Sequence, residues 1–128
     1  MSKTPIVLVV EDNAELRHVL KEALTAEGYQ VLTARDDADA LETLRHDSVH
    51  LLIADLATPA ASDGIETVRQ EFPDLPVVAL CPTAGGHPSL FFAAWQSPKR
   101  YRTLPKPFRL RELLAVSREM LEAVSERA

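Results

Sequence analysis

Three features are scarce in this sequence, and each absence argues against a class of protein. The single cysteine, Cys81, has no partner for an internal disulfide and fits a reducing cytoplasm. No apolar run approaches membrane-spanning length, and no apolar targeting segment precedes the first apolar run at residue 6. Basic residues are outnumbered, with 14 Lys and Arg against 19 Asp and Glu, which argues against a nucleic-acid-binding surface. We therefore expect a cytoplasmic protein that contacts neither membranes nor nucleic acid.

What is present favours one domain over residues 1–128. The chain is long enough to bury a core, and 46% of its residues are hydrophobic. It has no internal repeat, low-complexity segment or linker that would divide it. We expect a single compact unit.

Short apolar runs alternate with segments of helical periodicity. The runs predict strands at residues 6–10, 29–34, 51–55, 76–80 and, more weakly, 101–104. The first expected helix begins at the Asn13 cap and ends at Gly28, and the second begins at the Asp36 and Asp37 caps. The third opens at Asp63 and Gly64 and ends at Pro73, and two more cover residues 89–96 and 110–126. Residues 81–88 are expected to form a loop. Strands that alternate with helices in this way favour an α/β fold, a doubly wound parallel sheet covered on both faces.

Helical spacing also indicates which side chains face the core. The positions expected inward are Leu16, Val19, Leu20, Ala23, Leu24, Leu41, Leu44, Ile65, Val68, Phe72, Leu110, Leu113, Leu114, Met120, Leu121 and Val124.

Carboxylates stand where two of the apolar runs end. Asp55 closes the third run, and Glu11 and Asp12 follow the first. If these two strands are neighbours, the acids meet at the carboxyl end of the sheet, where open α/β folds place their sites. Two such charges about 4 Å apart repel by about 4 kcal/mol at an effective dielectric near 20. Protonation or a hard cation relieves this repulsion, and the oxygen ligands favour Mg²⁺.

A lysine follows the last expected strand in the run Lys106-Pro107-Phe108. This position brings a fixed cation to the same end of the sheet, where it can bind phosphate oxygens. An aspartate beside Mg²⁺ and a lysine can act as a nucleophile toward phosphorus and become an acyl phosphate. The combination therefore favours phosphoryl transfer to Asp55.

Together these motifs resemble a response-regulator receiver domain of two-component signalling. The resemblance rests on residues 9–13, on residues 53–55 with Pro59, and on residues 106–108, in order along nearly the whole chain. It implies a five-stranded sheet of order 2-1-3-4-5 in a flavodoxin-like, CheY-like three-layer sandwich. It also implies a histidine kinase or phosphotransfer protein as phosphoryl donor, and a protein rather than nucleic acid as downstream target. The resemblance implies a phosphoacceptor module and not an enzyme acting on a separate substrate.

The resemblance also assigns roles to individual residues. Asp55 would accept the phosphoryl group and Lys106 would hold it. Mg²⁺ would be bound by Glu11, Asp12 and Asp55 together with the backbone carbonyl of Ala57, and Asp12 would be a direct ligand.

The sequence departs from the family pattern at four places. Thr58 stands where methionine usually precedes Pro59, and Gly64 lies one residue later than in the commonest spacing. The Ser or Thr expected at the end of the fourth strand falls on Cys81, whose thiol is a weak donor, with Thr83 two residues on. The last departure is Thr103, which stands where an aromatic switch is usual, with the displaced Tyr101 nearby. We expect phosphorylation to be intact and its readout to be altered, with Thr83 or Cys81 at the switch position.

Simpler interpretations of the same residues remain open. Asp55 alone would be read as a turn cap, Glu11 as a helix-start charge and Lys106 as an exposed side chain. Cys81 fits a small buried filler, and Thr83 fits a turn residue equally well.

Residues 90–95, with three aromatic rings, predict a short helix that is apolar on all sides. One sheet cannot easily cover three rings, so one ring is expected to form a partner or homodimer surface.

Two other functions compete with the phosphorylated receiver. A degenerate receiver would bind partners without being phosphorylated, and Cys81 and Thr103 favour it. A flavodoxin-like flavin carrier shares the sheet, but its phosphate loop would follow the first strand, where Glu11 and Asp12 would repel the phosphate.

Overall fold

Five parallel strands form the centre of the molecule in this computed structural model, which describes residues 4–55, 59–82 and 101–127. The strand order is β2-β1-β3-β4-β5, so the expected order 2-1-3-4-5 is confirmed. The elements are β1 (Ile6–Val10), α1 (Ala14–Ala26), β2 (Gln30–Ala34), α2 (Asp37–His46), β3 (Leu51–Asp55), α3 (Pro59–Glu71), β4 (Val77–Pro82), β5 (Tyr101–Lys106) and α5 (Leu110–Arg127).

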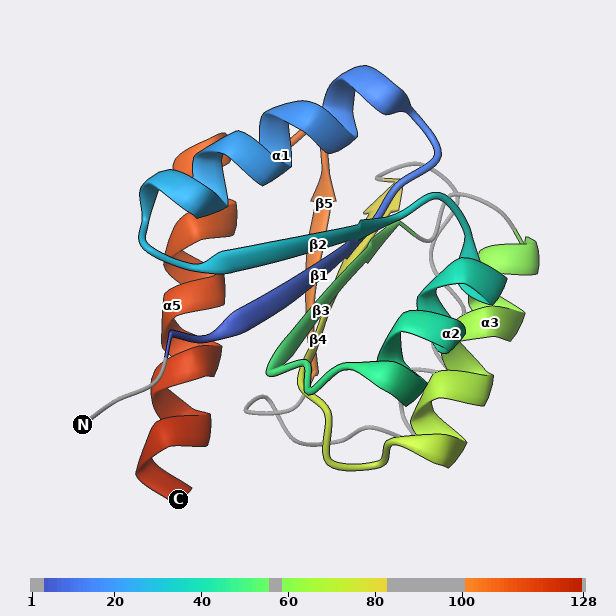
Figure 1. Ribbon diagram of the computed structural model, residues 1–128. Helices are drawn as coiled ribbons and strands as arrows, with labels where there is room; N and C mark the ends of the chain where they lie inside the picture. The colour runs from blue at the N-terminus through green and yellow to red at the C-terminus, as the bar shows by residue number, and fades with distance from the viewer. Residues whose placement is uncertain (1–3, 56–58, 83–100, 128) are drawn as a thin grey trace.

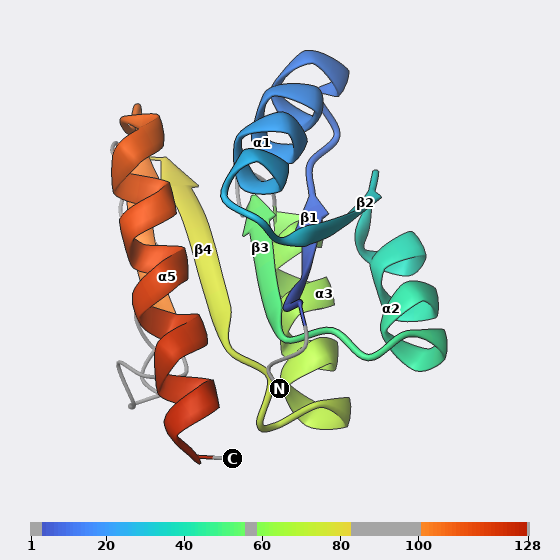
Figure 2. The same ribbon diagram turned by 60° about the vertical axis from the view of Figure 1, so that its left-hand side comes forward.

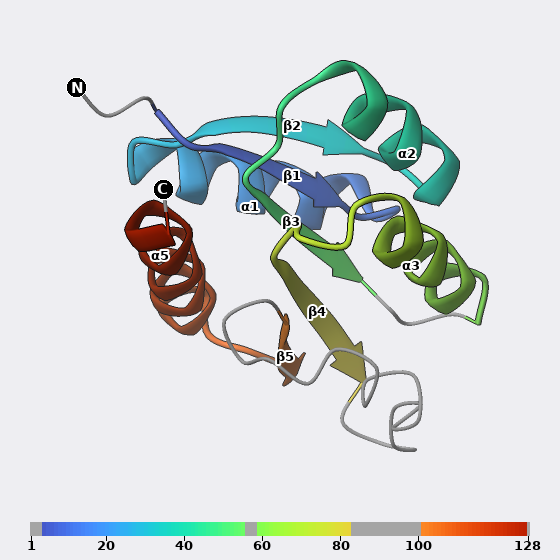
Figure 3. The same cartoon turned by 90° about the horizontal axis from the view of Figure 1, so that it is seen from below.

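Helices cover both faces of the sheet, α1 and α5 on one side and α2 and α3 on the other (Figures 1 and 2). The same three layers are seen from below in Figure 3. The doubly wound α/β sandwich is thereby confirmed. No helix in the described ranges is long and apolar enough to cross a membrane.

Alternation along the buried strands supplies a separate core to each face, because successive side chains point to opposite sides. On the α1 and α5 side, Val9 and Ile53 pack with Leu24 and Leu113. On the α2 and α3 side, the neighbouring residue Leu52 packs with smaller partners that include Ala40. Burial on both faces explains why the central strands are continuously apolar.

The expected caps Asn13 of α1 and Asp36 of α2 are present, whereas Asp37, also expected as a cap, is the first residue of α2 itself. The Asn13 side chain accepts a hydrogen bond from the Leu16 N–H at 3.0 Å, and the Asp36 side chain accepts one from the Asp39 N–H at 2.9 Å. Gly28 follows α1 with a φ of +97°, a conformation that glycine adopts without strain.

The third helix begins earlier than expected. The sequence predicted its start at Asp63 and Gly64, but α3 already begins at Pro59, whose fixed φ suits a first helical turn. Gly64 lies within the helix, buried against Asp37 of α2. A Cβ at position 64 would overlap the Asp37 side chain, so glycine serves here for close helix packing and not as a start signal.

Strands β4 and β5 each extend two residues beyond their expected ends. Cys81 and Pro82 belong to β4 and not to a loop, and β5 continues through Lys106. Strand β4 pairs with β3 only as far as Leu80, so residues 81 and 82 pair with β5 alone. A proline that lacks an N–H is tolerated at such a half-paired position.

Among the positions expected in the core whose side chains the structure describes, which leave out Ile65 and Val124, two are exposed. Val19 on α1 is 48% exposed and Leu110, the first residue of α5, is 38% exposed. Both lie at the margin of an apolar stripe whose centre is buried, as at Leu20 and Leu113. The expected helix over residues 89–96 and the aromatic run 90–95 lie outside the described residues.

Candidate functional site

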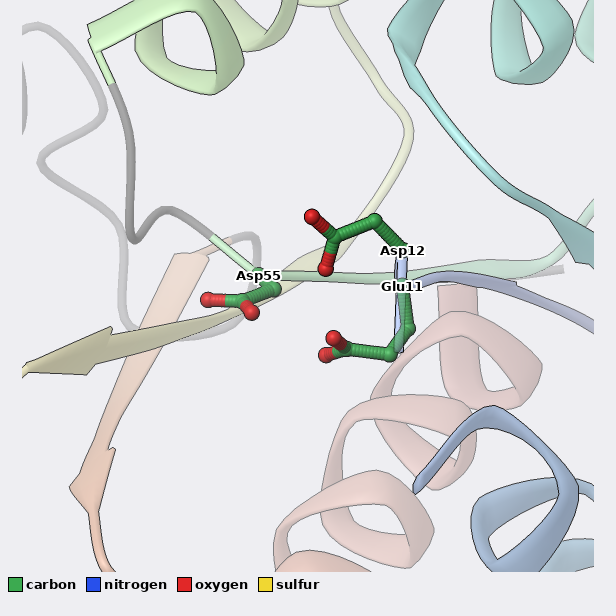
Figure 4. Close-up of side chains that lie close together, drawn as sticks. All are labelled: Glu11, Asp12 and Asp55. Carbon is green, nitrogen blue, oxygen red and sulfur yellow. The ribbon is translucent and has the colours of Figure 1, made fainter. Parts of the chain in front are cut away.

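Three carboxylates meet at the carboxyl end of the sheet, as Figure 4 shows. Asp55 is the last residue of β3, and Glu11 and Asp12 directly follow β1. Because β1 and β3 are paired neighbours, one oxygen of each acid lies within 4.8 Å of the others. The convergence expected from the sequence therefore exists in the structure.

Lys106, the last residue of the edge strand β5, brings a cation to these acids. Its Nζ donates to Oδ2 of Asp55 at 2.7 Å and lies 4.0 Å from Oε2 of Glu11. The parallel pairing of β4 with both β3 and β5 carries Lys106 to this end. The ammonium group thus contacts Asp55 directly and lies near Glu11.

Glu11 is the most buried member of the cluster, with 2% of its surface exposed. Its Oε1 accepts the Asn13 N–H at 3.1 Å, but its buried Oε2 accepts no hydrogen bond from the described residues. A buried carboxylate oxygen without a donor is costly unless a proton or a cation satisfies it.

Burial is the main cause that raises the pKa of Glu11 from its ordinary 4.5 to about 7. The negative charge of Asp55 acts in the same direction, whereas the Asn13 N–H and the charge of Lys106 act against it. Near neutral pH the metal-free cluster therefore holds a proton for part of the time.

The donor set fits a small hard cation. All of its side-chain ligands are carboxylate oxygens, and no His or Cys joins the group among the described residues. Mg²⁺ prefers such oxygens and keeps several waters, and the exposed Asp12 leaves room for them. The orphaned oxygen of Glu11 is a second feature that a cation would satisfy.

The structure describes only some of the remaining residues that were expected at the site. Ala57 and Thr83 lie outside the described residues, and so does Thr58. Cys81 is the fifth residue of β4 by backbone, but its side chain is not described. Thr103 is exposed on β5, paired in register with Ala79.

Arg17 is a residue of the site that the sequence interpretation missed. Its Nη1 donates to the backbone carbonyl of Glu11 at 2.7 Å from the second turn of α1. The available signal was its position one helical turn after the Asn13 cap, which places it on the side of α1 facing the β1 end.

A family model described as "Response regulator receiver domain" matches residues 7–118. Response regulator MprA of Mycobacterium ulcerans is 37% identical over 118 residues, which cover 90% of this chain and 49% of the relative. Transcriptional regulatory protein CpxR of Klebsiella pneumoniae is 38% identical over 117 residues, which cover 90% of this chain and 48% of the relative. The chain thus spans about half the length of the curated relatives it matches.

A solved structure confirms the architecture independently. The CheY-like receiver domain protein of Methanospirillum hungatei superposes with a TM-score of 0.86 at 20% identity. The superposition covers 98% of this chain and all of the other. At this identity the likeness concerns the fold.

Proposed function

The chain belongs to the response regulator receiver domain family, and from that membership we propose that Asp55 accepts a phosphoryl group in the presence of Mg²⁺. Receiver domains are signalling modules of two-component systems, and the family implies a histidine kinase or phosphotransfer protein as donor. We propose that this chain works with such a donor and passes the signal on through contacts with a protein target.

The contact that carries this proposal is the 2.7 Å bond between Lys106 and Asp55, within the cluster that Asp55 forms with Glu11 and Asp12. It holds a nucleophilic oxygen beside a fixed cation and beside candidate metal ligands. Positioning and charge compensation supply most of the catalysis in phosphoryl transfer, and this geometry provides both.

In the proposed reaction, a carboxylate oxygen of Asp55 attacks phosphorus. The new P–O bond forms as the bond from phosphorus to the donor's histidine nitrogen breaks, and that nitrogen keeps the electron pair and takes up a proton. Lys106 exchanges its bond to the Asp55 carboxylate for one to a phosphoryl oxygen. When bound, Mg²⁺ would supply positive charge to the phosphoryl oxygens.

We propose that Glu11, Asp12 and Asp55 hold the metal, with the carbonyl of Ala57 as a further ligand. Asp12 is the proposed direct ligand because its carboxylate is the exposed member of the cluster. We propose that Thr83 or Cys81 takes the place of the Ser or Thr that the family has at the end of the fourth strand, the switch position.

A second candidate function is partner binding without phosphorylation. Thr103 favours it, since an exposed hydroxyl at this position of β5 cannot supply the ring movement of the usual readout. Beryllofluoride, a phosphoryl mimic, distinguishes the two functions. A degenerate receiver would bind Mg²⁺ weakly and show no response to the mimic.

Intact-mass analysis after incubation with acetyl phosphate and Mg²⁺ tests the proposal. We expect one phosphoryl adduct on the wild-type chain, none on Asp55→Asn, and the wild-type amount on Asp47→Asn, an exposed aspartate just beyond α2. Absence of the adduct from the wild-type chain, or an equal adduct on Asp55→Asn, would contradict the proposal.

A further inference from the structure

The Arg17 side chain holds the peptide that joins the two acids of the β1 end. Its Nη1 donates to the Glu11 carbonyl oxygen at 2.7 Å, and this oxygen belongs to the peptide between Glu11 and Asp12. The Arg17 side chain is half-buried. A charge-assisted bond of this length is stronger than a neutral one and fixes the orientation of the peptide plane.

The residues on either side of Asp12, Glu11 and Asn13, are held by further bonds. The Glu11 N–H donates to the Ala34 carbonyl at 3.1 Å, which ties the segment to the end of β2. The Asn13 N–H donates to the Glu11 side chain at 3.1 Å, and the Asn13 carbonyl accepts the Arg17 N–H at 2.9 Å. Glu11 and Asn13 are therefore each anchored twice or more.

Asp12 differs from these two neighbours. Its carboxylate is exposed and has no hydrogen-bond partner among the residues that the structure describes. The direction of its side chain thus depends on the backbone from which it projects. That backbone is oriented by the bond from Arg17 to the preceding carbonyl.

We propose that Arg17 is a positioning residue for the Mg²⁺ site, acting through the Glu11–Asp12 peptide. The inference rests on the proposed function, because it assigns Arg17 to the metal site described there. Groups that orient metal ligands from outside the coordination sphere typically change metal affinity 10- to 100-fold when they are removed. We expect Arg17 to fall in this range.

Electrostatics and positioning give opposite expectations for the loss of Arg17. Removing a positive charge near a cation site strengthens the attraction for Mg²⁺, so charge alone makes binding tighter. Loss of the peptide orientation makes binding weaker, because Asp12 then samples directions that do not face the metal. The sign of the change therefore separates the positioning role from a simple charge effect.

The experiment is a calorimetric titration of the whole chain with MgCl₂ alone, at one fixed pH and ionic strength. Arg17→Met keeps the apolar stem but removes the donor and the charge. Arg17→Lys keeps the charge and the ability to donate, now from an ammonium group. Arg45→Met is the matched control, because Arg45 is an exposed arginine paired with Glu71 on α2 and α3, away from the acid cluster.

We expect the Mg²⁺ Kd of Arg17→Met to rise by roughly tenfold or more. Arg17→Lys should recover part of this loss and Arg45→Met should bind as the wild type does. Thermal unfolding in EDTA checks that each variant is folded, and Arg17→Gln replaces Arg17→Met if that variant is not. Added Mg²⁺ should raise the Tm of Arg17→Met less than that of the wild type.

Two results would overturn the inference in distinguishable ways. Equal or tighter Mg²⁺ binding by a folded Arg17→Met, with normal binding by the wild type, removes the positioning role and leaves the proposed function standing. Failure of the wild-type chain to bind Mg²⁺ contradicts the proposed metal site itself and the inference with it.

Discussion

Polar groups at the two ends of the same sheet differ in how well they are hydrogen-bonded. At the amino end, Ile6 and His50 satisfy each other: the His50 N–H donates to the Ile6 carbonyl at 2.8 Å, and the Ile6 N–H donates to Nδ1 of His50 at 2.9 Å. At the carboxyl end, a buried oxygen of Glu11 lacks a donor among the described residues and three carboxylates crowd together.

This difference separates stability from function. Buried polar groups are nearly always hydrogen-bonded in folded proteins, and exceptions call for an explanation. The Ile6–His50 pair at the amino end follows that rule and ties β1 to the residue that precedes β3. The carboxyl end departs from it at residues that a cation and a phosphoryl group would satisfy. Substitutions at the amino end should therefore change the free energy of unfolding and not Mg²⁺ binding, whereas substitutions at the carboxyl end should change Mg²⁺ binding as well.

The largest effect on stability is expected from Leu51→Ala at the amino end of β3. Leu51 is fully buried in the core on the α1 and α5 side, so its truncation removes apolar contacts and leaves a cavity. We expect the free energy of unfolding to fall by about 2–5 kcal/mol in urea denaturation. Mg²⁺ affinity at the opposite end should stay the same. A large loss of affinity in a variant that remains folded would break the separation of the two ends.

The next effect is a pH dependence that arises at the carboxyl end. The pKa of Glu11 is raised by burial from 4.5 to about 7, so between these values the folded state holds a proton that the unfolded state lacks. The free energy of unfolding of the metal-free protein should therefore fall as pH rises through this window, by up to about 3 kcal/mol.

Glu11→Gln isolates this contribution, because the other titrating groups, including all four histidines, stay in place. Denaturation in EDTA across the window should give a flatter profile for Glu11→Gln and greater stability than the wild type at the alkaline end. Mg²⁺ binding by the variant should be weaker. Parallel profiles for the two proteins would show that Glu11 does not titrate there.

The smallest effect is expected from His50→Ala at the amino end. This change leaves the Ile6 N–H without its acceptor and should lower the free energy of unfolding by about 1–3 kcal/mol. His50→Asn is the matched control, since the Asn side chain places an oxygen near the position of Nδ1. The free energy of unfolding should fall less for His50→Asn than for His50→Ala. Equal decreases in the two variants would mean that the hydrogen bond contributes little.

Local sequence signals predicted the scaffold of the site well. Continuous apolar runs marked the buried strands, and the Asn13 and Asp36 caps marked the starts of α1 and α2, because these features act over a few residues. The signal failed at Asp63 and Gly64, where a turn-like pair lies inside α3. Glycine is required at position 64 because the helix packs against Asp37 of α2 there, and this contact cannot be read from the local sequence.

The sequence alone determined which chemistry is available: acids after two strands, a lysine after a third, and too few soft ligands for another metal. The family resemblance already implied that β1 and β3 are neighbours. Only the tertiary structure decided that Lys106 reaches Asp55 and that Glu11 is buried enough to raise its pKa to about 7. It also brought Arg17 onto the Glu11 carbonyl. The physical reason is that electrostatic and hydrogen-bond energies depend on distance and burial, which are set by strand pairing and helix packing.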